Sequence, residues 1–160
     1  MAIDLTSKVI SITPTLDTSA YAAGDHLGTL MEVANAVDES SGTGKLVSVV
    51  VLDKAKQTLA LDVLIFRDKP TLTSVDNAAL DISDTEMEKC IGNVRVAITD
   101  YAALNANSVA SVKNINLMLH SVKDTTTNPT GRSIWVILMA QGAPTYAAGS
   151  LIVKLGIAQD

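Results

Sequence analysis

The apolar positions of this chain fall into short runs, and most of them recur with the period of two that is typical of β-strands. The strongest signal lies in residues 45–67, where two runs rich in Val, Leu, Ile and Phe flank the polar break 53–57. β-Branched and large aliphatic residues at this density favour strands over helices. Two such runs around a five-residue break predict an antiparallel hairpin. Because the second run is apolar on both faces, we expect it to be central or covered.

The same alternation predicts six further strands, separated by segments rich in Gly, Pro, Asn, Asp, Ser and Thr. They span residues 8–13, 29–37, 93–99, 108–120, 133–140 and 151–157. In the segment 93–99 we expect Val94, Val96 and Ile98 to face inward, and we expect residues 100–107 to form a loop. Together with the two central runs this gives about eight strands.

One short helix is predicted at residues 84–91. Ser83 and Glu86 have the spacing of a capping box, Lys89 lies near the end, and Gly92 follows it. Because strands do not alternate with long helices, a parallel α/β sheet is not expected. The pattern predicts an all-β fold, an antiparallel β-sandwich of jelly-roll type, in one domain of residues 1–160. Residues 1–7 are expected to be a loosely held N-terminal arm.

A four-residue echo lies near the two ends of the chain. Residues 21–24 and 146–149 both read Tyr-Ala-Ala-Gly, and each precedes a strand. Four residues do not establish a repeat. We interpret the echo as a shared loop shape in which Tyr covers the end of the core.

Composition adds an unusual surface to this picture. Hydrophobic residues make up 48% of the chain but charged residues only 18%, against about 25% in a typical soluble domain. Such a surface suits a protein that is partly buried against neighbours. The net charge is -5 and the twelve Lys and Arg residues are scattered, which argues against a nucleic-acid partner. Neither a membrane-spanning run nor a signal-peptide pattern is visible, so we expect synthesis in a cytoplasm and no membrane partner.

Few residues could carry chemistry. The single Cys90 is interpreted as a core residue rather than a nucleophile. Residues 42–45 read Gly-Thr-Gly-Lys but lack the rest of a phosphate-binding loop. His26 follows Asp25 in a predicted loop and is the one candidate for a catalytic pair, whereas His120 is expected on a solvated strand face. No catalytic, cofactor-binding or metal-binding residue is assigned, and we expect neither a cofactor nor an enzyme.

Two binding chemistries were weighed on particular residues. Calcium could be held by the acidic stretch 76–88, but Ala78 and Ala79 stand where ligands would be needed. Sugar-binding surfaces usually present exposed aromatic rings. Since Trp135 lies inside an apolar run, the rings left for that task are Tyr21, Tyr101 and Tyr146.

One segment carries a family resemblance. Residues 64–80, LIFRDKPTLTSVDNAAL, combine a strand ending in Phe with Pro-Thr and Asp-Asn-Ala-Ala, and a short acidic helix ending in Ile91-Gly92 follows. This pattern resembles small structural proteins of tailed bacteriophages, and the loop 18–25 and the segment 144–146 are similar to them too. The resemblance covers about residues 10–157.

The resemblance implies an all-β virion protein that decorates or cements the head. A protein of this kind would be made in the host cytoplasm and would lie on the capsid surface. It would bind the major capsid protein and its own copies, often as a homotrimer at local threefold positions. The alternative is a receptor- or glycan-binding module on a head fibre or tail. A third hypothesis, an enzyme, would require a hydrolytic activity that is lost in His26→Ala.

Overall fold

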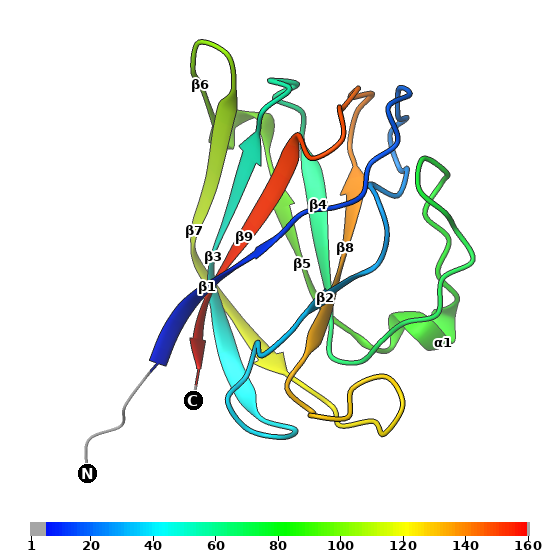
Figure 1. The fold of residues 1–160 in the computed structure, drawn as a ribbon, viewed down its shortest axis with the longest axis vertical. Coiled ribbons are helices and arrows are strands. Elements are labelled where there is room, and N and C mark those ends of the chain that lie inside the picture. The colour runs from blue at the N-terminus through cyan, green and yellow to red at the C-terminus, as the bar shows by residue number, and fades with distance from the viewer. Residues whose placement is uncertain (1–5, 160) are drawn as a thin grey trace.

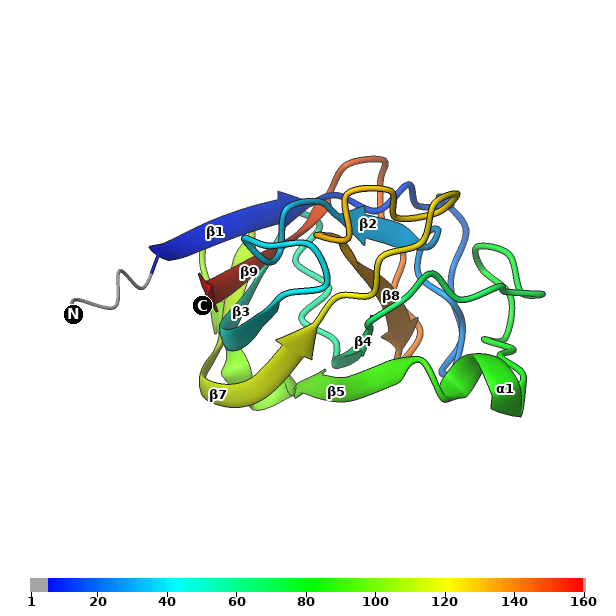
Figure 2. The same cartoon turned by 90° about the horizontal axis from the view of Figure 1, so that it is seen from below.

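In the computed structural model, which describes residues 6–159, two antiparallel sheets pack face to face (Figures 1 and 2). The first sheet has, in spatial order, β1 (Thr6–Ile12), β9 (Leu151–Gln159), β3 (Thr43–Asp53), β7 (Ser108–His120) and β6 (Tyr101–Ala103). The second has β2 (Met31–Val33), β8 (Ile134–Ala140), β4 (Leu61–Phe66) and β5 (Cys90–Val96). The predicted all-β sandwich is confirmed.

The strand pairing is that of a jelly roll. When the short edge strand β6 is left out, the first strand pairs with the last, and pairing continues inward: β1 with β9, β2 with β8, β3 with β7, and β4 with β5. Successive pairs alternate between the two sheets. The chain is therefore one long antiparallel ribbon wound around a core, which is how a jelly roll buries both sheets.

The predicted hairpin over residues 45–67 is wrong. β3 pairs with β7 and β9, whereas β4 pairs with β5 and β8 in the other sheet. The polar break is an arch between sheets, held by the Asp53 carboxylate, which accepts hydrogen bonds from the backbone N–H groups of Ala55 (3.0 Å) and Thr58 (2.8 Å). Lys56 and Thr58 both have a φ of 51°. The expectation that the second run is central is confirmed, because β4 lies between β8 and β5.

Aliphatic side chains fill the space between the sheets, because alternate residues of each strand point inward. β3 contributes Leu46, Val49 and Val51, β9 contributes Leu151, Val153, Leu155 and Ile157, β4 contributes Leu61, Val63 and Ile65, and β8 contributes Ile134, Val136 and Leu138.

Two tyrosines belong to the same core. Tyr21 and Tyr146 are both 2% exposed, and their rings meet edge to face with centroids 6.3 Å apart. Gly24 and Gly149 end the two echoed segments with φ values of 94° and 70°. The echo is thus a shared loop shape, as predicted.

A second, smaller core covers the outer face of the four-stranded sheet. Phe66, Trp135 and Ile137 are buried there against side chains of the connection 67–83, including Leu72 and Leu80. Figure 1 shows this connection and α1 (Asp84–Met87) on the side of the sheet away from β9 and β3. This covering explains why β4 and β8 are apolar on both faces.

The short helix α1 holds the connection 67–83 in place. Ser83 Oγ accepts a hydrogen bond from the Glu86 backbone N–H (3.3 Å), which confirms the serine half of the predicted capping box. The Glu86 carboxylate accepts from the Thr71 N–H (2.6 Å) and from Lys89 Nζ (2.8 Å), so it ties the connection to the helix. The predicted helix 84–91 is too long. It ends at Met87 because Cys90 already pairs with Phe66 in β5.

Other predicted boundaries also change. Ile98 is 58% exposed instead of buried, because the strand gives way to the 3-10 turn η1 (Ile98–Asp100), where the Asp100 carboxylate accepts from the Ala97 N–H (2.8 Å). β6 follows within the expected loop 100–107 and pairs with β7. The strand predicted at 29–37 shrinks to β2, and Asn35 beyond it has a φ of 55°.

The expected N-terminal arm, residues 1–7, falls in two parts. Residues 1–5 lie outside the described residues. Thr6 and Ser7 already belong to β1, where they pair with Gln159 and Ala158 of β9.

Substituting Phe66→Ala tests the second core. We expect the free energy of unfolding to fall by about 3 to 5 kcal/mol, because the change leaves a cavity under the connection. Urea unfolding followed by tryptophan fluorescence measures it. As a control, Val75→Ala should stay within about 0.5 kcal/mol of the parent, since Val75 is 70% exposed. An equally small effect of Phe66→Ala would show that the connection does not cover the sheet.

Candidate functional site

The outer face of the five-stranded sheet is open, and we call it the lysine face. Its residues are the side chains that point away from the core on four strands. They are Ser7, Val9 and Ser11 of β1, Lys45, Ser48, Val50 and Leu52 of β3, Val109, Ser111, Lys113 and Met118 of β7, and Ile152, Lys154, Gly156 and Ala158 of β9.

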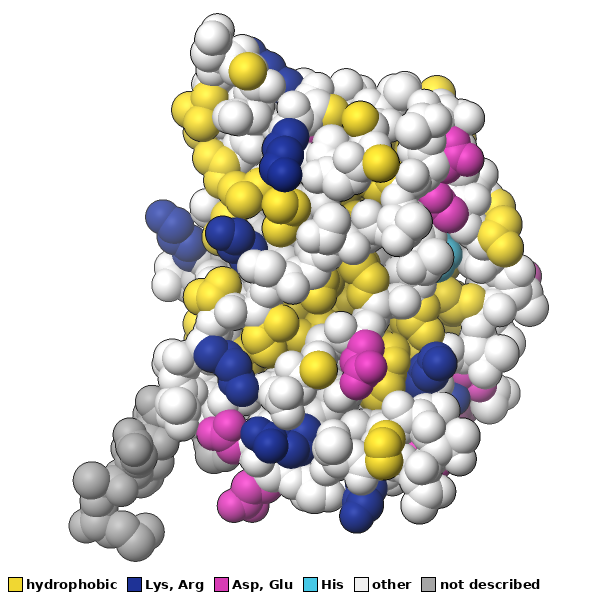
Figure 3. Space-filling model, viewed as in Figure 1, with side chains coloured by type: hydrophobic (Ala, Val, Ile, Leu, Met, Phe, Trp, Pro, Cys, Tyr) yellow, Lys and Arg dark blue, Asp and Glu magenta, His cyan; other side chains and the backbone are white. Residues whose placement is uncertain are grey.

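Register places these residues in rows across the sheet. Leu52 is flanked by Val109 and Ile152, which gives an aliphatic row across β7, β3 and β9. In the next row Val50 lies between Ser111 and Lys154. In Figure 3 yellow and dark-blue side chains alternate along the left, over β9, β3 and β7. The face thus mixes aliphatic surface with cationic ends of long side chains.

The charge of this face has one sign. Lys45, Lys113 and Lys154 are its charged residues, and none of them forms an ion pair with another residue of the described range 6–159. The chain as a whole carries a net charge of -5. The lysine face is therefore positively charged, whereas the rest of the chain is net negative. The charge is thus distributed unevenly, which the net charge alone does not show.

Two hollows lie at the ends of the lysine face. One, of about 320 Å³, is lined by Leu52, Lys54, Leu104 and Val109 among others. The other, of about 260 Å³, is lined by residues that include Val9, Val47, Ser48 and Gly156. A Cβ at Gly156 would clash with Ser48 Oγ. Val9 and Leu104, on the walls of the hollows, are 67% and 54% exposed. Exposed apolar patches rimmed by polar residues are typical of interaction sites.

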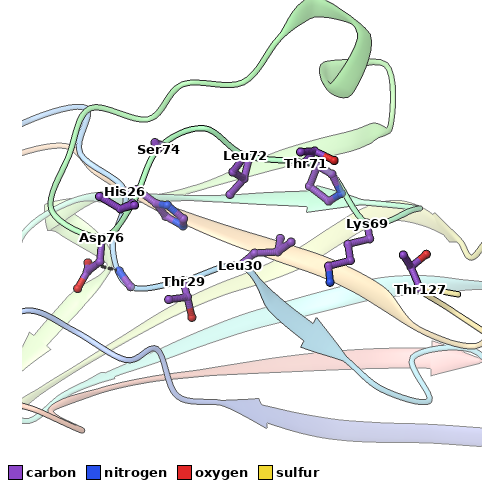
Figure 4. Close-up of a pocket in the computed structure, with 12 residues that line it drawn as sticks. His26, Thr29, Leu30, Lys69, Thr71, Leu72, Ser74, Asp76 and Thr127 are labelled. Carbon is purple, nitrogen blue, oxygen red and sulfur yellow. Dashed lines mark hydrogen bonds between the residues drawn. The ribbon is translucent and has the colours of Figure 1, made fainter.

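A larger pocket, of about 550 Å³, lies on the other side of the molecule, at the connection 67–83 (Figure 4). Its walls come from residues 26–30, which precede β2, and from residues 69–76, with Thr127 at one end. Figure 4 shows His26, Ser74 and Asp76 on one side of Leu30, and Lys69 and Thr127 on the other. The pocket therefore has two polar ends.

Asp76 holds one wall of this pocket in place. Its carboxylate accepts hydrogen bonds from the Tyr21 hydroxyl (2.8 Å) and from the backbone N–H groups of Gly28 (2.6 Å) and Asp17 (2.6 Å). The phenol of Tyr21 has its pKa raised by burial and by the adjacent carboxylate. Three donors from the segment 17–28 thus meet on one side chain of the connection, so the role of Asp76 is to join two loops.

His26 is buried, and it does not pair with Asp25, the one candidate for a catalytic pair in the sequence. The His26 side chain is 2% exposed, and neither ring nitrogen has a hydrogen-bond partner among the described residues. The Asp25 carboxylate instead accepts from the Ala22 N–H (2.7 Å). Burial lowers the pKa of His26 below its ordinary value of 6.5, although the charge of Asp76 opposes this shift. The imidazole is therefore neutral at pH 7.

The other sequence candidates lie apart. Cys90 is a free thiol that packs against the second core. Gly44 and Lys45 are paired residues of β3, so residues 42–45 do not form a phosphate loop. His120 is exposed, as predicted. In the acidic stretch 76–88, the Asp76 and Glu86 carboxylates accept hydrogen bonds from neighbouring loops. No cluster of three metal-ligating side chains occurs within residues 6–159.

The tyrosines do not offer the aromatic platforms of a sugar site. Tyr21 and Tyr146 are buried in the main core. Tyr101 is half-buried, with its hydroxyl oxygen inaccessible. Among the described helices, none is long and apolar enough to cross a membrane.

Sequence reasoning missed the lysine face. Its lysines stand at alternate positions of apolar strands, and that signal is visible along the chain. It marks which residues point outward but not that β3, β7 and β9 are neighbours, so the lysines seemed scattered.

Comparison with known proteins finds structural matches of low sequence identity and low TM-score. No family model matches the chain, and no curated protein matches it. Several solved structures that align with it come from viruses. Chains from Desmodium yellow mottle tymovirus (11% identity, 99% of this chain, 82% of that chain, TM-score 0.29), the picornavirus equine rhinitis A virus (13%, 96%, 70%, 0.33) and the VP2 subviral particle of infectious bursal disease virus (12%, 98%, 41%, 0.33) are examples. These scores are too low to carry a conclusion about function.

Removing the Asp76 carboxylate should destabilise both the segment 17–28 and the connection 67–83, which it joins. We expect Asp76→Ala to lower the free energy of unfolding by about 2 kcal/mol or more, because a buried phenol and two backbone N–H groups lose a charged acceptor. Urea unfolding measures the loss. Glu39→Ala, at an exposed acid of the turn before β3, is the matched control and should be nearly neutral. A neutral Asp76→Ala would contradict the joining role.

The burial of His26 predicts a pH dependence. The unfolded chain takes up a proton near pH 6.5, whereas the folded chain does so only at lower pH. Stability is therefore full above pH 6.5 and declines as the pH falls toward the folded pKa, by at most about 1.4 kcal/mol per pH unit. Unfolding measured between pH 7.5 and 5.5 should show this slope in the parent and in His120→Gln. His26→Gln should lose it, and an unchanged slope there would sink the assignment.

Proposed function

We propose that this chain is a structural protein of a virus particle, a decoration or cement protein that binds major capsid subunits through its lysine face. The observation that carries the proposal is that face: an open sheet surface with an aliphatic row, two hollows and lysines as its only charges. The family resemblance of residues 64–80 supports a location in the virion, and within the virion it favours a phage head. The location is then the capsid surface, after synthesis in the host cytoplasm.

The chemistry of the lysine face specifies its partner. Burial of Leu52, Val109 and Ile152 supplies affinity at about 25 cal/mol per Å² of apolar area. The lysine stems can lie along that apolar surface while their ammonium groups stay at the rim. Carboxylates on the partner would then fix orientation and exclude wrong partners. The partner surface is thus apolar at its centre and acidic around it.

Self-association uses another surface in this proposal. Two copies meeting through the lysine face would place lysine against lysine without an acid on either side, which disfavours that dimer. Homotrimers at local threefold positions, which the resemblance implies, would form through edges and loops outside this face. The bond to the capsid and the bonds between copies are therefore separable by mutation.

The proposed action is binding without catalysis. Three carboxylates are engaged in holding loops: Asp53 in the arch, Asp76 between two loops, and Glu86 under the connection. The alternative function is a receptor- or glycan-binding module. The fold is compatible with it, since jelly rolls also occur in lectin domains. A fold does not fix a function, and the buried positions of Tyr21 and Tyr146 disfavour a stacking sugar site.

Charge reversal on the lysine face tests the proposal. Particles of the virus that encodes the chain should carry on the order of hundreds of copies, as a symmetric lattice of sites requires. On particles prepared without the protein, added wild-type chain should rebind. We expect the triple variant Lys45→Glu, Lys113→Glu and Lys154→Glu to bind at least about tenfold more weakly, because it removes complementary charge. Cosedimentation at fixed salt measures binding.

The matched control is Arg67→Glu, Lys69→Glu and Lys123→Glu, which changes net charge equally at exposed residues outside the lysine face. It should bind like the parent. Equal weakening by both triples would mean that overall charge, not this face, matters. About a dozen copies or fewer per particle would favour a tail or fibre part, and sugar binding on a glycan array would favour the alternative.

A further inference from the structure

The pocket beside the connection contains unpartnered polar groups at its inner end. His26 is 98% buried by accessible area, its exposed fraction being 2%, and both ring nitrogens lack hydrogen-bond partners within the described chain. Ser74 Oγ, from the opposite wall, is also buried without a partner. Buried polar groups are nearly always hydrogen-bonded, so two such groups in one pocket require an explanation. A ligand group between them would supply it.

The chemistry of that inner group is constrained. A neutral imidazole offers one donor and one acceptor, and a serine hydroxyl offers both. The third polar residue there, Asp76, already accepts three hydrogen bonds. An anion at this end would meet the Asp76 charge, and a cation would have to be desolvated beside a neutral imidazole. A neutral group that both donates and accepts, such as a hydroxyl or a primary amide, fits best.

The rest of the pocket is apolar until its outer end. Leu30, Pro70, Leu72 and Val75 are its apolar lining residues, and Figure 4 shows Leu30 and Leu72 between the two polar ends. At the far side Figure 4 shows the Lys69 side chain directed back toward Leu30. The Lys69 ammonium forms no ion pair with any residue of the range 6–159. An apolar body with an anionic outer end is therefore complementary to the pocket.

We propose that this pocket binds an elongated, mainly aliphatic monocarboxylate whose far end bears a hydroxyl or amide. The carboxylate meets Lys69, the aliphatic body lies against Leu30 and Leu72, and the far polar group hydrogen-bonds with His26 and Ser74. A volume of about 550 Å³ is in the range of small-molecule sites. The site lies across the molecule from the lysine face, so it does not depend on the proposed capsid contact.

Three probes of one length separate the two ends of the ligand. 8-Hydroxyoctanoate has both polar ends, octanoate lacks the hydroxyl, and 8-aminooctan-1-ol replaces the carboxylate with a cation. Calorimetry and proton NMR of the whole chain measure binding. We expect 8-hydroxyoctanoate to bind about tenfold more tightly than octanoate, and the amine not to bind detectably. The chain has two histidines, so the imidazole signal of His26 should shift while that of exposed His120 should not.

Variants assign the two ends. Lys69→Met should weaken 8-hydroxyoctanoate about tenfold, and Lys56→Met, at an exposed lysine of the arch, should leave binding unchanged. Ser74→Ala should reduce the preference for 8-hydroxyoctanoate over octanoate while leaving octanoate binding nearly unaffected. Absence of binding at millimolar concentration, equal binding of all three probes, or binding unaltered by Lys69→Met would each overturn the proposal.

Discussion

The pairing of the first strand with the last, and of each strand inward with its counterpart, is the constraint on which this structure depends. β1 with β9, β2 with β8 and β3 with β7 join segments far apart along the chain. Each of these pairings closes a long loop of the chain. Because ordering a long chain costs conformational entropy, the aliphatic interior must supply the compensating burial. This is why both sheets direct Val, Leu and Ile inward almost without exception.

The same winding leaves the two outer faces unequal. The four-stranded sheet receives the long connection 67–83 and α1, whose apolar side chains bury Phe66, Trp135 and Ile137. On the five-stranded sheet the outward side chains of Leu52, Val109 and Ile152 stay partly exposed within the described residues 6–159. The two sheets of the sandwich therefore differ in how much of their outer apolar surface the chain itself buries.

Features that neighbouring residues determine could be predicted from the sequence, whereas features that depend on distant segments of the chain could not. Period-two alternation located β7 at Ser108–His120 without error, and Ser83 marked the start of α1 correctly. The same local signal gave a hairpin at 45–67, because two apolar runs around a polar break look alike whether the break closes a hairpin or crosses between sheets. Only the partners of β3, 55 to 115 residues further along the chain, decide between the two.

The sites show the same limit. His26 stands in a polar, loop-like stretch, and no local pattern indicates its burial. The burial arises because its backbone N–H donates to Ala78 O and its carbonyl accepts from Asn77 N–H, which places the ring under the connection.

Asp76 links the sandwich to the pocket through one carboxylate. Its bond to Tyr21 reaches a ring that packs on Tyr146 at the end of the main core, while its bond to Gly28 positions the loop that carries His26 and Leu30. Gly28 itself has a φ of 82° and lies so close to Pro14 that a Cβ would clash. A small movement of the connection would thus be transmitted to both places. The wall of the pocket that carries His26 is thus tied through Asp76 and Tyr21 to the end of the main core.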